Sequence, residues 1–245
     1  MGYQNHPLGA PVNILTMNNT SFHEYLATLN INELRIMKVD VQRELNKRLD
    51  STDNIFDKCV SSYPDYIGDD FADEILTEAK KLLTDNNRDV VKPVSVWYGD
   101  KPYKYNGHEV HPANPIPAGS VVKKGLNMVN SDLGQSFDGC WAAIYPSKKC
   151  HIPPHADNEH AIDQNSPIVN ISVGAKITSV FNGKSKYGRK STTATFRTKL
   201  KNKSLPVMHP GCQDKLVHSV PPGDDSDGPR ALLSYRKSSE GSLKH

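Results

Sequence analysis

The sequence predicts an α+β protein in which a double-stranded β-helix, or jelly roll, is supported by N-terminal helices. Two observations indicate this fold. Apolar residues recur at helical spacing in two segments before residue 90, and short runs of alternating polarity, broken by Gly, Pro and Asn, follow that point. At 245 residues the chain is long enough to bury a sizeable core. We therefore expect helices that lean on a sandwich of two sheets.

The first expected helix begins at Asn30, in the segment NINELRIMKVDVQRELNKRL. Its apolar side chains share one face: Leu34, Met37, Val41, Leu45 and Leu49. Asn30 is a suitable N-cap, and Glu33 three residues later would complete a capping box. This helix either packs on the main body of the protein or binds a partner, and the sequence leaves both possibilities open.

The second expected helix lies in GDDFADEILTEAKKLL, residues 68–83. Acidic side chains crowd its first turn, where we expect Asp69 or Asp70 to be the N-cap. An apolar stripe then follows, made of Phe71, Ala72, Ile75, Leu76, Ala79, Leu82 and Leu83. Seven later segments have the length and composition of strands in a sandwich or barrel: VSVWYG, CWAAIY, PIVNISVG, ITSVF, TATFRTKL, LPVMH and ALLSYR.

Composition narrows the class of protein. Hydrophobic residues make up 36% of the chain and the longest apolar runs are only a few residues, so we expect no membrane span and no signal peptide. The four cysteines lie far apart without a C-x-x-C pair, which argues against a zinc knuckle and fits a reducing compartment. We therefore expect an intracellular protein.

Charge is distributed unevenly along the chain. Residues 1–120 carry 12 basic and 17 acidic side chains, whereas residues 121–245 carry 18 and 10. Within the second half, residues 184–203 contain eight basic side chains and no acidic one. Most such runs are solvated surface, but a basic strand can also follow a phosphate backbone.

The segment HIPPHADNEH, residues 151–160, has the composition of a metal site. Alternate side chains of a strand point the same way, so His155 and Asp157 could bind one metal together. Pro153 and Pro154 exclude a helix that would bring His151 onto the same face as His155 and Asp157. His160 also lies too far along the segment to be an expected ligand. Two ligands leave the site incomplete, so a third must come from elsewhere.

Two later histidines are candidates for that third ligand. His209 precedes a proline and a glycine and is typical of a turn, whereas His218 lies beside a strand-like segment. Two imidazoles and one carboxylate leave three positions of an octahedral iron open for a chelating cosubstrate and dioxygen. Arg230 and Arg236 would share one face of a strand, roughly 20 Å apart at Cα, and guanidinium groups bind carboxylates. A small dicarboxylate would fit between their side chains.

Four blocks, in this order, resemble the AlkB-like iron and 2-oxoglutarate dioxygenases: IYPSKKCHIPPHADNE, SPIVNISVGAKITSVF, PVMHPGCQDKLVHSVPP and GPRALLSYR. YGDKPYKYNG is similar to the nucleotide-recognition lid of that family. The resemblance implies a catalytic domain over residues 63–240, after a helical extension over residues 1–62. The short HADNE form is also similar to AlkB domains of viral or mobile-element polyproteins.

The resemblance implies a role for each candidate residue. It assigns three Fe(II) ligands: His155, Asp157 and His218. Arg230 would pair with the distal carboxylate of 2-oxoglutarate, Tyr145 would hydrogen-bond this cosubstrate, and Arg236 would lie near Asp157 and the proximal carboxylate. The chain departs from the family at Ala143 and Leu232, where polar Asn is common, so cosubstrate binding could be weaker or arranged differently.

The implied reaction uses Fe(II), 2-oxoglutarate and O2 to demethylate bases of the 1-methyladenine or 3-methylcytosine type in single-stranded RNA or DNA. It yields formaldehyde, succinate and CO2. A flipped base needs a stacking aromatic and a polar contact. Tyr98, Tyr103 and Tyr105 are candidates for stacking, with strand packing as the alternative, and Glu159 is the candidate for the polar contact. Lys199 and Lys201, on the basic segment, are candidates for contacting the nucleic-acid backbone.

Two other functions stay open at this point. Some relatives act on a protein or a lipid, and a binding module with an idle pocket would need the same fold. The basic segment and the lid tyrosines argue against the first alternative. The complete ligand set argues against the second.

Overall fold

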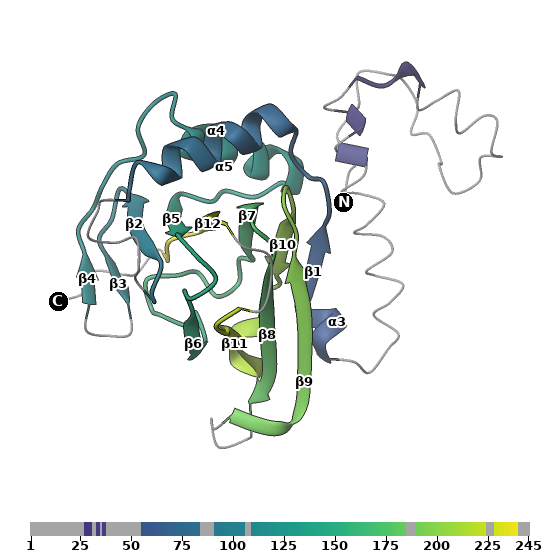
Figure 1. Ribbon diagram of the computed structural model, residues 1–245, viewed down its shortest axis with the longest axis vertical. Coiled ribbons are helices and arrows are strands. Elements are labelled where there is room, and N and C mark those ends of the chain that lie inside the picture. The colour runs from purple at the N-terminus through teal and green to yellow at the C-terminus, as the bar shows by residue number, and fades with distance from the viewer. Residues whose placement is uncertain are drawn as a thin grey trace.

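The computed structural model describes residues 27–30, 33–34, 36–37, 55–83, 91–105, 109–184, 190–223 and 228–239. Two β-sheets face each other, and helices α4 (Asp69–Lys80) and α5 (Val121–Leu133) cover the outer face of the larger sheet (Figure 1). This arrangement confirms the predicted α+β jelly roll.

The larger sheet has six antiparallel strands. Across the sheet they are β1 (Val60–Tyr63), β10 (Leu205–Met208), β7 (Ile168–Gly174), β12 (Arg230–Arg236), β5 (Gly139–Tyr145) and β2 (Val94–Gly99). Sheet order therefore differs from chain order, as it does when a chain winds between the two sheets of a jelly roll.

The smaller sheet has four strands, and a separate hairpin stands beside the larger sheet. The four strands, in order, are β6 (Ile152–His155), β11 (Leu216–Val220), β8 (Ile177–Lys184) and β9 (Lys190–Leu200). The hairpin consists of β3 (Tyr103–Tyr105) and β4 (Glu109–His111). All seven segments predicted as strands form strands.

Helix α4 lies where the apolar stripe predicted it, but its cap differs from the prediction. Gly68 occupies the N-cap position and makes no side-chain capping bond. Asp69 and Asp70 instead lie in the first turn, where carboxylates favour the helix dipole. The Asp69 carboxylate accepts a hydrogen bond from the Lys203 ammonium group at 2.8 Å, so a tertiary contact takes the place of the expected cap.

Helix α5 was not predicted from the sequence. It begins after Ser120, whose hydroxyl accepts the backbone N–H of Lys123 at 3.2 Å, and it ends at Gly134 in a left-handed conformation. Gly125 stands in its middle because a Cβ atom there would lie 2.2 Å from the hydroxyl oxygen of Tyr235 on β12. Two short helices complete the described elements: α3 (Ile55–Cys59) and α6 (Cys212–Lys215).

The start of the N-terminal helix confirms the expected capping box. The backbone N–H of Asn30 donates to the Glu33 carboxylate at 2.9 Å, and the backbone N–H of Glu33 donates to Asn30 Oδ1 at 3.1 Å. Met37 is helical as expected. Val41, Leu45 and Leu49 lie outside the described residues, and the expected division at residues 62 and 63 stays a prediction.

The main core lies between the two covering helices and the larger sheet. Fully buried members include Ile75 of α4, Val129 of α5 and Ile144 of β5. Between the two sheets, smaller apolar clusters leave a cavity.

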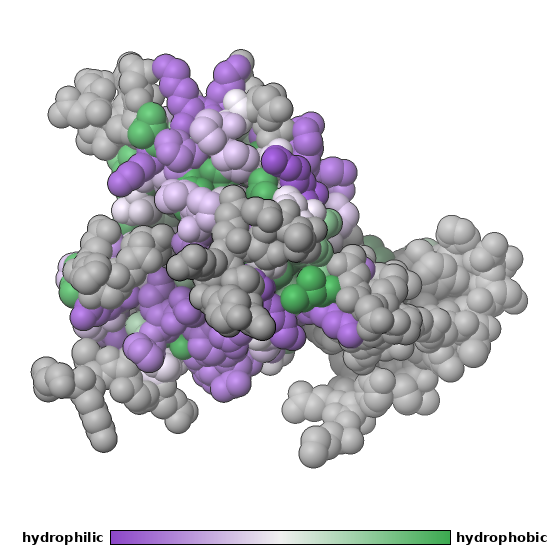
Figure 2. Space-filling model, turned by 90° about the horizontal axis from the view of Figure 1, so that it is seen from below, coloured by the Kyte–Doolittle hydropathy of each residue, from purple (hydrophilic) through white to green (hydrophobic). Residues whose placement is uncertain are grey.

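The described surface is largely hydrophilic. Figure 2 shows hydrophilic side chains over most of the coloured part of one face, with a few separate hydrophobic ones. No helix within the described ranges has the length and apolar character needed to cross a membrane.

Candidate metal and cosubstrate site

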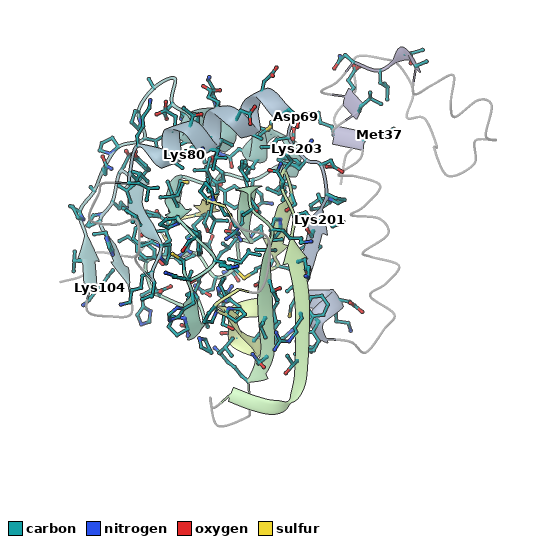
Figure 3. The ribbon with its side chains drawn as sticks, in the orientation of Figure 1. Met37, Asp69, Lys80, Lys104, Lys201 and Lys203 are labelled. Atoms are coloured by element: carbon teal, nitrogen blue, oxygen red, sulfur yellow. The ribbon has the colours of Figure 1, made fainter. Side chains whose placement is uncertain are left out.

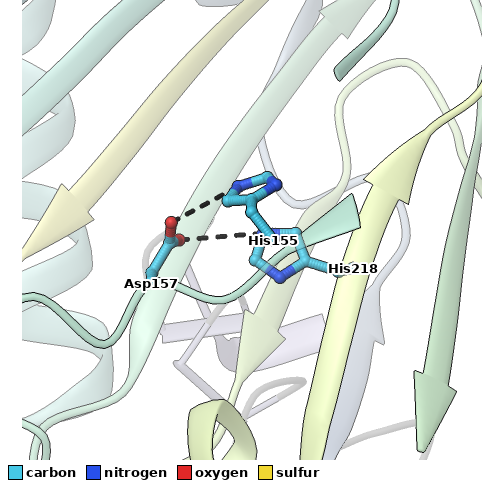
Figure 4. Close-up of side chains that lie close together, drawn as sticks. All are labelled: His155, Asp157 and His218. Atoms are coloured by element: carbon cyan, nitrogen blue, oxygen red, sulfur yellow. Dashed lines mark ion pairs between the residues drawn. The ribbon is translucent and has the colours of Figure 1, made fainter. Parts of the chain in front are cut away.

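Two imidazoles and one carboxylate lie together in the cavity between the sheets (Figure 4). His155 is the last residue of β6, and it pairs in register with His218 of β11, so the two rings lie 4.2 Å apart at their centroids. Asp157 brings its carboxylate to the same place, and candidate ligand atoms of the three residues lie within 4.8 Å of one another.

The structure corrects one step of the sequence argument. His155 and Asp157 were expected on one face of a strand, but β6 ends at His155 and Asp157 follows in an irregular segment. The two side chains converge because tertiary contacts hold Asp157. The two prolines of the segment stand inside β6, and the carbonyl oxygen of Pro153 accepts a hydrogen bond from His155 Nδ1 at 2.9 Å. Nδ1 therefore carries the proton, and Nε2 faces Asp157 Oδ1 at 3.5 Å, where the candidate ligand atoms of the three residues converge.

The electrostatics of the three side chains favour metal binding. Burial would raise the pKa of Asp157, but Arg236 and the two imidazoles outweigh it and hold the pKa far below its usual range. Burial, followed by the charge of His155, lowers the pKa of His218 to about 4. Burial would lower the pKa of His155, but the adjacent Asp157 carboxylate raises it above the usual value. The site thus holds a carboxylate and a neutral His218.

Arg236 fixes the Asp157 carboxylate from the larger sheet. Its NH2 group lies 3.2 Å from Asp157 Oδ2, and its NH1 group donates to the Tyr103 hydroxyl at 2.6 Å. The Tyr103 ring packs on Trp97, with 4.7 Å between centroids. A Cβ atom at Gly139 would lie 2.2 Å from the Trp97 ring, so this glycine makes room for the indole. A packed aromatic group thereby holds the arginine that holds the carboxylate.

Arg230, at the other end of β12, is buried next to the cavity and has no anionic partner among the described residues. Its Nε donates to the Ser172 hydroxyl at 3.1 Å, and its guanidinium carbon lies 4.9 Å from the centre of the Tyr145 ring. Its NH1 atom has no hydrogen-bond partner among the described residues. A buried guanidinium with an unused donor is suited to bind a carboxylate. Gly174, with φ of +92°, lets β7 pass close to the backbone before Arg230.

One cavity connects the metal-binding cluster with Arg230. Four alternate residues of β12 line it: Arg230, Leu232, Ser234 and Arg236. This confirms that the two arginines share one face. Ala143 and Leu232 are apolar lining positions where polar Asn was noted as common, whereas Asn170 and Ser234 are polar residues that also line the cavity.

Comparison with known proteins decides the family. A family model described as the 2OG-Fe(II) oxygenase superfamily matches residues 70–240. The chain belongs to this superfamily. Its curated relatives make it an AlkB-like member, and the family implies Fe(II), 2-oxoglutarate and O2 as the cofactor and cosubstrates.

The relatives of this oxygenase match only part of its length. DNA oxidative demethylase ALKBH2 of Mus musculus is 29% identical over 144 residues, which cover 57% of this chain and 59% of the mouse protein. The Homo sapiens protein of the same name is 30% identical, with 57% and 54% covered. Alpha-ketoglutarate-dependent dioxygenase alkB homolog 3 of Bos taurus is 27% identical over 150 residues, with 58% and 50% covered. The chain thus spans between half and three fifths of these relatives.

A solved structure, that of OsALKBH1, superposes on the oxygenase with a TM-score of 0.49 and 15% identity. The superposition covers 73% of this chain and 97% of that one.

Glu159 lies near the metal-binding cluster, in the irregular segment that follows β6. Both of its carboxylate oxygens are buried and accept no hydrogen bond from the described residues. Burial, and then the charge of Asp157, raise the pKa of Glu159. This carboxylate therefore stands beside the metal-binding cluster, near the Tyr103 hydroxyl.

The three candidate stacking tyrosines have different surroundings. Tyr98 points to the helix-covered face of β2 and packs on the main core, so it faces away from the cavity and its expected stacking role is wrong. Tyr103 is 2% exposed and packs on two tryptophans, which makes it a packing residue that supports Arg236. The side chain of Tyr105 lies outside the described part of the chain.

The sequence analysis missed one aromatic residue of this oxygenase. Trp141 lines the cavity and is half-buried, and its ring lies edge-on to His111 of the hairpin at 4.5 Å. Strand alternation in CWAAIY puts Trp141 on the same face as Tyr145, so the signal was present in the sequence.

The basic segment is only partly a strand face. Arg197 and Lys199 are exposed on the outer face of β9, as expected from alternation. The strand ends at Leu200, however, so Lys201 lies beyond it, just before a turn at Asn202 and Lys203. Lys203 pairs with Asp69, and the expectation that no acid neutralises this segment is wrong (Figure 3).

Three other histidines of the described chain lie outside the cluster. His209 Nε2 is 2.9 Å from the Ser61 hydroxyl oxygen, which leaves His218 as the third member of the cluster. His160 is exposed, and His151 Nδ1 contacts the Lys149 carbonyl oxygen at 3.3 Å.

Proposed function

We propose that this oxygenase demethylates N-methylated bases of the 1-methyladenine or 3-methylcytosine type in single-stranded RNA or DNA, and releases formaldehyde, succinate and CO2. One observation carries the proposal: a single cavity joins a cluster of two imidazoles and a carboxylate to a buried arginine that has no anionic partner among the described residues. The names of its relatives, DNA oxidative demethylases among them, support a nucleic-acid substrate.

The residues present fit an iron ion. Two neutral imidazoles and one carboxylate form the donor set of non-heme Fe(II) oxygenases. Asp157 Oδ1 is buried and accepts no hydrogen bond among the described residues, so it is available as a ligand. His155, Asp157 and His218 would hold the metal. When bound with 2-oxoglutarate and O2, it supplies the oxidising power that removes hydrogen from an N-methyl group.

The residues also fit a dicarboxylate. Arg230 offers a buried NH1 group, and Tyr145 lies under its guanidinium. We assign the distal carboxylate of 2-oxoglutarate to these two side chains. Arg236 would act mainly through Asp157, because both of its terminal nitrogens already have partners within 3.2 Å. We take the Arg230 end of the cavity as the main anchor of the dicarboxylate.

The assignment of residues to the nucleic-acid substrate rests on charge. Bases methylated at these ring nitrogens carry a positive charge, and the Glu159 carboxylate is buried beside the cluster. We assign Glu159 to the base. Lys199 and Lys201, both exposed, would contact the phosphate backbone, and Tyr105 remains the lid candidate for stacking.

Formaldehyde release tests the proposal. Matched single-stranded RNA and DNA oligomers, each with one 1-methyladenine or 3-methylcytosine, are incubated with Fe(II), 2-oxoglutarate and the protein. We expect formaldehyde and succinate in equal amounts from at least one oligomer and none from its unmethylated copy. Succinate without formaldehyde from every oligomer would contradict the proposal and favour a protein or lipid substrate.

A further inference from the structure

The three members of the metal-binding cluster are held in place by different means. His155 and His218 belong to paired strands, so the ladder between β6 and β11 fixes their backbones. Asp157 follows the end of β6 and belongs to no helix or strand. Its backbone position must therefore come from contacts other than a sheet or helix.

Two glutamine side chains supply those contacts. The Asp157 backbone N–H donates to Gln213 Oε1 at 2.9 Å, and the Asp157 carbonyl oxygen accepts from Gln164 Nε2 at 3.3 Å. A side-chain amide has an oxygen that accepts and an NH2 group that donates, so glutamine can hydrogen-bond either a backbone N–H or a backbone carbonyl oxygen. The backbone of Asp157 is thereby bound on both sides.

Gln213 is built for this position. It is 6% exposed, and its Nε2 lies 3.4 Å from the sulfur of Met208. It belongs to α6, the turn that leads into β11 and His218. Lys184 of β8 donates to the Gln213 carbonyl oxygen and ties this turn to the smaller sheet. The segment that carries one member of the cluster thus also positions another.

We propose that Gln213 and Gln164 are positioning residues that set the place of Asp157 for metal binding. The inference rests on the proposed ligand set. Without the Gln213 amide, the Asp157 N–H would be buried without a partner, and the segment would shift to reach another acceptor. A carboxylate that must be reordered on each binding event binds metal more weakly than one held in place.

Metal affinity measures this role without catalysis. The metal-free protein is titrated with Co(II), an air-stable substitute for Fe(II), and binding is followed by the visible absorbance of the bound ion. We expect Gln213→Leu to weaken Co(II) binding about 10- to 100-fold. Gln213→Glu, which keeps an oxygen acceptor at the same place, should restore most of the affinity. Gln135→Leu is the matched control, because Gln135 is a half-buried glutamine that follows α5 and should leave affinity unchanged.

Unfolding of the metal-free variants separates positioning from folding. If Gln213→Leu does not fold, Gln164→Met decides, with an expected loss of up to about tenfold. Wild-type Co(II) affinity in a folded Gln213→Leu or Gln164→Met variant would overturn the inference. His155→Ala is measured in parallel. If His155→Ala binds Co(II) as tightly as wild type, the proposed ligand set is wrong. If only His155→Ala loses binding and the glutamine variants keep wild-type affinity, the ligand set stands and the positioning role is wrong.

Discussion

At the scale of single residues, the Asp157 carboxylate balances several positive or protonatable groups in a buried place. Arg236 lies 3.2 Å from Oδ2, and the two imidazoles lie within 3.8 Å of the carboxylate oxygens. Removal of the carboxylate leaves the buried Arg236 guanidinium with its hydrogen bond to the Tyr103 hydroxyl but without the Asp157 charge. Asp157→Ala should therefore weaken metal binding. It should also lower the free energy of unfolding by about 3–5 kcal/mol.

His155→Ala and Asp157→Ala should both abolish succinate formation, because each removes a proposed metal ligand. His151→Ala and His160→Ala should largely spare it, because these side chains lie outside the cluster. Succinate release and bound iron are measured for the four purified variants. Loss of iron in His160→Ala would show that the ligand assignment is wrong.

Glu159→Ala should separate two activities. Its carboxylate is proposed to contact the base and not the metal, so turnover of 2-oxoglutarate without substrate should stay near the wild-type rate. Demethylation of an oligomer should fall by about tenfold or more, the typical effect of losing a charge-assisted hydrogen bond. The two rates are compared in the same preparation, and an equal loss of both would refute this division of roles.

At the scale of elements, Gly125 sets two effects against each other. Helix propensity alone predicts that Gly125→Ala stabilises α5 by about 1 kcal/mol. The new Cβ would lie 2.2 Å from the hydroxyl of Tyr235, which is fully buried and donates to the Val122 carbonyl oxygen at 3.0 Å. Overpacking of this kind costs about 1–3 kcal/mol, so we expect net destabilisation.

Urea unfolding checks the sign of that change. Asn127→Ala, at an exposed position of the same helix, is the control and should be neutral or slightly stabilising. A Gly125→Ala variant more stable than wild type would show that α5 can move away from β12.

The strands were predictable because their alternation survives in the sequence, whereas α5 was not. Glycine and asparagine in its middle weaken the helical signal, and its glycine is explained only by a tyrosine more than a hundred residues away. The position of Asp157 was equally hidden, since glutamines 7 and 56 residues away hold it.

Strand alternation has a further limit, shown by β2. It tells which residues share a face, but both faces of the larger sheet are covered, one by helices and one by the smaller sheet. Polarity then does not reveal which face borders the cavity. Tyr98 was proposed as a stacking residue because it lies in the lid-like segment, although it packs under the helices.

At the scale of the whole molecule, the uneven charge predicts how binding depends on salt. Lys199 and Lys201 are exposed, whereas Lys203 pairs with Asp69. Replacement of Lys199 and Lys201 with alanine should reduce the log-affinity versus log-salt slope for single-stranded oligomers by about 1.4 if both contact phosphate. Lys203→Ala should change the slope little. Binding is measured at several salt concentrations, and an unchanged slope in the double variant would make this segment ordinary solvated surface.

Strand β1 has a consequence for any shortened form of the protein. Its register places Val60, Ser61, Ser62 and Tyr63 along β10, at the edge of the larger sheet. A fragment that starts at residue 63 would lose three of these four residues and uncover the hydrogen-bonding groups of β10. Exposed strand edges pair with other copies and promote aggregation. Soluble, monodisperse fragments should therefore begin before Ile55, so that α3 and the whole of β1 are retained.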